Sequence, residues 1–68
     1  SKIEELPYTI TGIILNLRKR LIDNKIKTLK EEISILENED KDPSSIFLEV
    51  IEYNTLKNTI VKRLGWNM

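Results

Sequence analysis

Apolar residues recur at intervals of three and four over most of the chain, and this spacing constrains the fold more than any other feature. Such intervals place side chains on one face of an α-helix, whereas a strand would show strict alternation. Two series precede the middle of the chain: Ile10, Ile14, Leu17 and Leu21, and then Ile22, Ile26, Leu29, Ile33 and Leu36. They predict a first helix over about residues 7–36, with Pro7 in the first turn, where a missing N–H costs nothing.

The two apolar series of this helix do not share a face. At about 100° per residue, their centres lie roughly 120° apart, and the change falls at Leu21 and Ile22. A helix with one partner would keep a single stripe that drifts by only about 20° per heptad. Either the two halves are buried against different partners, or the helix kinks near Asn24, or the stripe is broad. The two-partner and broad-stripe interpretations have equal weight, and we pursue the first because it makes a testable prediction.

The acidic stretch from Glu37 to Ser45, ENEDKDPSS, reads as a turn rather than a metal site. A calcium loop needs glycine at its sixth position and glutamate at its twelfth, and this stretch has neither pattern. Asp42 followed by Pro43 is instead a strong helix start, with aspartate as N-cap and proline as the first helical residue. We therefore expect an acidic turn over residues 37–42 and no metal site.

A second helix is predicted over about residues 43–64. Its last turn carries Lys62 and Arg63, which suit the negative end of the helix dipole. Gly65 suits the left-handed position after a helix, and Trp66 can fold back onto the helix end. The predicted fold class is all-α, a helical hairpin of two long antiparallel helices that forms a single interaction module over residues 1–68.

Composition narrows the classes of function. The 68 residues include no cysteine and no histidine, so disulfides, thiolate metal sites and histidine chemistry are excluded. A domain this small buries only about 60% of its unfolded surface and usually needs a partner. The formal net charge is zero, which argues against nucleic acid as the direct ligand. We expect a cytoplasmic fragment of a larger protein, without cofactor or membrane span.

Catalytic residues are not recognisable in the sequence. Serine and threonine have no histidine or activated lysine beside them, and a two-helix chain lacks the concave pocket that enzymes use. We therefore expect no enzyme activity from this chain. A basic cluster in the first helix is interpreted as a solvated face, because its members are spread around the helix: Arg18, Lys19, Arg20, Lys25, Lys27 and Lys30.

The apolar arc of the second helix is wider than one facing helix can cover. Part of it should close the hairpin, together with the second series of the first helix: Val50, Ile60, Val61, Ile26, Leu29 and Ile33. The remainder should bind a protein or a second copy of the chain, because large exposed apolar patches mark interaction sites. The predicted partner-binding residues are Phe47, Ile51, Tyr53, Leu56 and Trp66.

The segment IEYNTLKNTIVKRLG, which follows a long helix and an acidic turn, resembles the carboxyl-terminal tail of bacterial DnaG-type primases. The matching positions are Glu52, Tyr53, Leu56, Lys62, Leu64 and Gly65. The resemblance implies a hairpin that docks on the amino-terminal domain of the replicative helicase during DNA replication. The parent protein would then be a DNA-directed RNA polymerase whose catalytic and zinc-binding parts lie upstream.

Two other classes of function fit the same pattern. One is a homodimeric four-helix bundle of the RNA-binding, plasmid-copy type, in which the basic cluster would line up across the dimer. The other is a generic coiled-coil adaptor. Helicity that depends on concentration would indicate self-association, and RNA binding that weakens steeply with salt would indicate the regulator.

Overall fold

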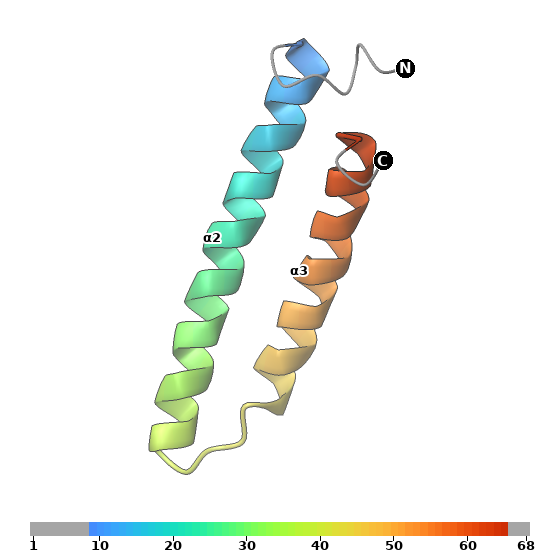
Figure 1. Ribbon diagram of the computed structural model, residues 1–68. Coiled ribbons are helices and arrows are strands. Elements are labelled where there is room, and N and C mark those ends of the chain that lie inside the picture. The colour runs from blue at the N-terminus through green and yellow to red at the C-terminus, as the bar shows by residue number, and fades with distance from the viewer. Residues whose placement is uncertain (1–8, 66–68) are drawn as a thin grey trace.

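The computed structural model describes residues 9–65, which form two antiparallel helices joined by a short turn (Figure 1). Helix α2 comprises Ile10–Asn38 and helix α3 comprises Ser44–Arg63. The hairpin is narrow, with principal extents of 49 × 17 × 14 Å. The all-α helical hairpin predicted from the apolar spacing is confirmed. Neither described helix is long and apolar enough to cross a membrane.

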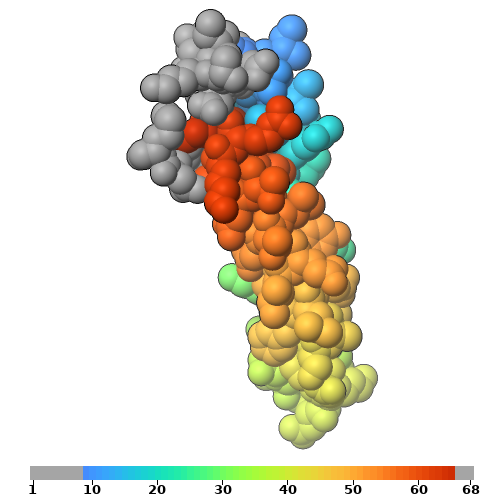
Figure 2. Space-filling model, turned by 90° about the vertical axis from the view of Figure 1, so that its right-hand side faces the viewer, coloured from blue at the N-terminus to red at the C-terminus, as the bar shows by residue number. Residues whose placement is uncertain are grey.

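The core is a single seam between the two helices. Its buried members are Leu15, Ile22, Ile26, Leu29, Ile33, Val50, Ile60 and Leu64, and Ile46 and Tyr53 pack against them. Buried residues on α2 recur at intervals of three and four, so they form a seam of the coiled-coil kind. Seen from the side of α3, that helix covers much of α2 along its length (Figure 2). Leu29, only 1% exposed, lies at the centre of the seam.

Helix α2 continues without a break through Leu21 and Asn24, so the predicted alternative of a kink there is wrong. Of the second apolar series, four members are buried against α3 and Leu36 is half-buried, whereas α3 does not cover the first series. All four members of the first series are exposed, from 45% at Ile14 to 79% at Ile10. The seam instead extends toward the amino terminus through Leu15, which belongs to neither predicted series, and Gly12.

Helix α2 begins at Ile10, three residues after the predicted start at Pro7, which itself lies outside the described residues. Thr9 is the N-cap, with extended backbone angles, and its hydroxyl accepts a 3.0 Å hydrogen bond from the Gly12 N–H. This bond satisfies one of the amide groups that the first helical turn leaves without a partner. The cap fixes where α2 starts.

The carboxyl end of α2 lies at Asn38, two residues beyond the predicted end at Leu36. Asp40 adopts the left-handed conformation, with φ of 57°. The Lys41 N–H then reaches the Leu36 carbonyl at 2.8 Å, and the Asp40 N–H reaches the Glu37 carbonyl at 3.1 Å. These two bonds form a Schellman cap, a role that glycine usually fills. Aspartate tolerates this conformation better than most residues, but no glycine marked the position in the sequence.

Helix α3 begins at Ser44, one residue later than predicted, because the Pro43 carbonyl accepts its first hydrogen bonds. The prediction of Asp42 as N-cap and Pro43 as first helical residue is wrong, because Pro43 is the N-cap and has no side-chain cap bond. The Asp42 carboxylate does accept bonds from the N–H and the hydroxyl of Ser44. This contact also lowers the pKa of Asp42. At the other end, Gly65 has the predicted positive φ, 76°. Trp66 lies outside the described residues.

Candidate interaction surface

The described surface carries large apolar side chains in two groups and a few isolated positions. The first group, which we call the α2 back stripe, consists of Ile10, Ile13, Ile14, Leu17 and Leu21. The second, which we call the α3 patch, consists of Phe47, Leu48 and Ile51 near the start of α3. Leu56 is exposed separately. The two helices do not cover these side chains, so the described part of the hairpin has several exposed apolar surfaces.

The predicted partner-binding residues do not form one surface. Phe47 and Ile51, one helical turn apart, are both exposed on the same flank of α3. Leu56 follows Ile51 by five positions, which turns it about 140° around the helix to the opposite flank. Tyr53 is half-buried and packs against the core between the two flanks. The sequence had not singled out Leu48, which is 61% exposed beside Phe47.

A largely apolar groove of about 450 Å³ runs between the helices on the flank that carries Leu56. Its lining includes Leu21 and Ile22 from α2 and Leu56 and Ile60 from α3, together with the side chains of Arg18 and Arg63. The described residues that line it include no carboxylate. A smaller hollow on the same flank of α3 shares Leu56 and is lined by Glu49, Glu52 and Tyr53.

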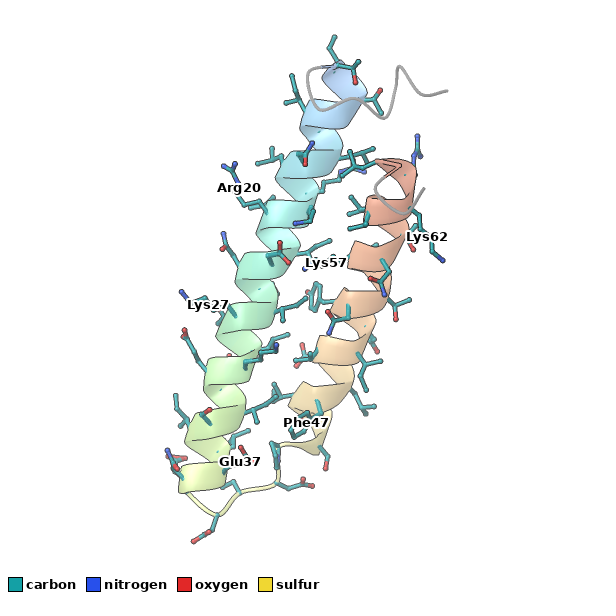
Figure 3. All side chains as sticks on the ribbon, viewed as in Figure 1. Arg20, Lys27, Glu37, Phe47, Lys57 and Lys62 are labelled. Atoms are coloured by element: carbon teal, nitrogen blue, oxygen red, sulfur yellow. The ribbon has the colours of Figure 1, made fainter. Side chains whose placement is uncertain are left out.

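Three charged residues interrupt the apolar seam. Lys57 of α3 points toward α2 (Figure 3), where its ammonium lies 2.6 Å from one carboxylate oxygen of Asp23. Lys19, one turn before Asp23 on α2, lies 3.2 Å from the other oxygen. The Lys57 contact is the main reason why the pKa of Asp23 lies below its ordinary 3.8; partial burial opposes this shift, and Lys19 adds to it. The bridge shows that Lys57 of α3 lies level with Asp23 of α2.

The predicted basic cluster is dispersed over the surface of α2. Arg20 and Lys27 project from α2 away from α3 (Figure 3), whereas Lys19 is engaged with Asp23. Arg18 lines the groove on the other flank. The described residues contain no group of three or more acidic or histidine side chains placed to hold a metal ion.

Some of the positions that carry the resemblance to the primase tail contribute to the fold, and others lie on the surface. Leu64 is buried in the core and Gly65 takes the left-handed conformation that ends α3. Glu52, Leu56 and Lys62 are exposed. Leu64 and Gly65 therefore serve the hairpin itself, whereas the sixth position, Tyr53, is half-buried against the core.

A model of the family described as "Domain of unknown function (DUF8430)" matches residues 1–68, and the chain therefore belongs to that family. No curated protein and no solved structure gives a significant match. The match places the whole chain within one family.

Proposed function

We propose that this chain is a non-catalytic protein-interaction module whose docking surface is the α3 patch. The observation that carries the proposal is the exposure of Phe47, Leu48 and Ile51 within five residues of one helix, at 47%, 61% and 60%. Aromatic side chains on such a patch are frequent binding hot spots. A helix that presents apolar residues one turn apart matches the way helices anchor in apolar grooves of partners.

The proposed partner is the amino-terminal domain of the replicative helicase. The support for this partner is the resemblance to the primase tail, of which Glu52, Leu56 and Lys62 are the exposed positions. In this proposal the hairpin would couple a primase to the helicase during DNA replication. Phe47 and Ile51 would supply the apolar contacts.

The test is a binding titration between the chain and a purified helicase amino-terminal domain, with Phe47→Ala as the variant. Truncating a central aromatic residue is expected to cost about 2 kcal/mol of binding, or roughly thirtyfold in Kd. Helicity by circular dichroism should stay unchanged, because Phe47 is exposed. Leu17→Ala is the matched control, since it removes a similarly exposed apolar side chain from α2.

Equal losses of binding and helicity in Phe47→Ala would refute the assignment of Phe47 to the interface. Equal weakening by Leu17→Ala would move the docking surface to the α2 back stripe. If the chain does not bind the helicase domain, the helicase is excluded as the partner. The α3 patch would then be tested against other proteins.

A further inference from the structure

We propose that two copies of this chain pair through the flank that carries Leu56, in an antiparallel arrangement whose two-fold axis passes close to Leu56. The inference goes beyond the proposed function, because it uses the flank of α3 opposite the α3 patch. It commits to a second copy as the occupant of the groove. The reason is the order of charges along that flank.

On α3 this flank is self-complementary. Glu49 precedes Leu56 by seven residues and Arg63 follows it by seven. Seven residues are nearly two turns, so the three side chains lie on one line, about 10 Å apart, with a drift of about 20° per step. If a second α3 runs antiparallel across a two-fold axis at Leu56, Glu49 of each copy faces Arg63 of the other. The arrangement closes with two ion pairs around a central pair of leucines.

The same axis also matches charges on α2. The 2.6 Å contact between Lys57 and Asp23 shows that Leu56 is level with the residues next to Asp23 on α2. Arg18 lies seven residues before Lys25 and Glu32 lies seven residues after it. An antiparallel pair of α2 helices therefore brings Arg18 of one copy to Glu32 of the other. Both Lys25 side chains come near the axis, where their long aliphatic stems let the amines reach water.

Apolar surface and net charge support self-association at the same place. Leu21 and Leu56, 58% and 48% exposed, line the groove between the two arginines, so pairing would take both from water. The arginines lack an acidic neighbour among the described residues that line this groove, while the neighbouring hollow holds Glu49 and Glu52. A formal net charge of zero also leaves little overall repulsion between copies. A two-fold interface of this kind is closed and does not propagate into fibres.

The first test is sedimentation equilibrium of the chain over a wide concentration range, with charge-reversal variants. We expect a monomer–dimer equilibrium in which Arg63→Glu and Glu49→Arg each raise Kd about tenfold, because each turns two attractive pairs into repulsive ones. The double variant should return Kd to within about threefold of the original value. Raising salt should reduce these differences.

Lys62→Glu is the matched control, because it makes the same charge change one residue away on a side chain that points away from α2 (Figure 3). It should leave Kd nearly unchanged. A chain that stays monomeric at all concentrations overturns the inference. So does a dimer that responds equally to Lys62→Glu and Arg63→Glu, or one that the double variant fails to restore.

Disulfide cross-linking gives a second readout that does not depend on changing the charges of the proposed ion pairs. The chain has no cysteine, so Leu56→Cys introduces one thiol next to the proposed axis. Mild oxidation should cross-link this variant far more completely than Leu48→Cys, which changes an exposed leucine outside the interface. Equal cross-linking of both variants would contradict the proposed axis. A monomer that still binds the helicase domain would overturn the pairing and leave the proposed function intact.

Discussion

The two halves of α2 carry apolar residues at the same helical spacing, yet these residues are buried in one half and largely exposed in the other. In the carboxyl-terminal half, Ile26, Leu29 and Ile33 are buried against α3. In the amino-terminal half, Ile10 and Leu17 remain exposed on the α2 back stripe. The seam does continue through Leu15, but on a different face of the helix. Periodicity therefore predicts a helix equally well in both halves, while burial depends on which face α3 meets.

The largest expected effect on stability comes from a substitution in α3 that disrupts its packing against the buried half of α2. Val50 of α3 lies in the core cluster with Leu29 and Ile33. Val50→Asp places a carboxylate in the seam, at a cost of several kcal/mol, comparable to the roughly 5 kcal/mol that holds a small domain together. We expect the hairpin to unfold, with a large loss of far-UV circular dichroism. Ile51→Asp, on the adjacent exposed residue, should keep its helicity; a folded Val50→Asp variant would refute this account of the core.

A smaller effect on stability is expected from a matched pair of substitutions, each of which truncates one leucine in one half of α2. Leu29→Ala removes a fully buried side chain and should lower the free energy of unfolding by about 2–5 kcal/mol. Leu17→Ala removes an exposed side chain and should change it by no more than about 0.5 kcal/mol in the monomer. Urea unfolding at a single low protein concentration measures both values. A large loss in Leu17→Ala would mean that the α2 back stripe is covered in solution.

The smallest effect concerns Asp23, near the border between the halves. Because contact with Lys57 lowers the pKa of the folded carboxylate, Asp23 contributes stability above the unfolded value of 3.8. That contribution is lost as the pH falls through the lowered, folded pKa. Asp23→Asn should therefore be less stable than the original chain at neutral pH, by under about 1 kcal/mol since the pair is partly exposed. The difference, measured by urea unfolding, should shrink as the pH falls below 3.8; one that does not change with pH would show that the charge of Asp23 is not its cause.

Local sequence chemistry accounts fully for the carboxyl end of α3, in part for its amino end, and not at all for the carboxyl end of α2. Gly65 was expected in the left-handed conformation and has it, since glycine alone lacks the steric penalty. Asp42 was expected to cap α3 and does bond to Ser44, although the first helical residue is shifted by one. Asp40 gave no such signal, because aspartate adopts the left-handed conformation only where the surrounding hydrogen bonds favour it.

The candidate surface was less predictable than the fold. The width of the apolar arc on α3 indicated exposed residues, and Phe47, Ile51 and Leu56 are indeed exposed. The sequence grouped them as one site, although the turn of the helix separates Leu56 from the other two. The ion bridge to Asp23 was also missed; the available signal was that Lys57 continues the three-and-four spacing of the core positions on α3.

The sequence by itself determined the two helices, the turn between them and the apolar spacing of the seam, because these follow from local backbone preferences and a fixed helical period. Only the tertiary structure decided which apolar face of α2 meets α3, and hence that Leu15 is buried while Leu17 is not. Burial is settled by the geometry of a second helix, which fits one face at a time and leaves the other apolar face to water or to a partner.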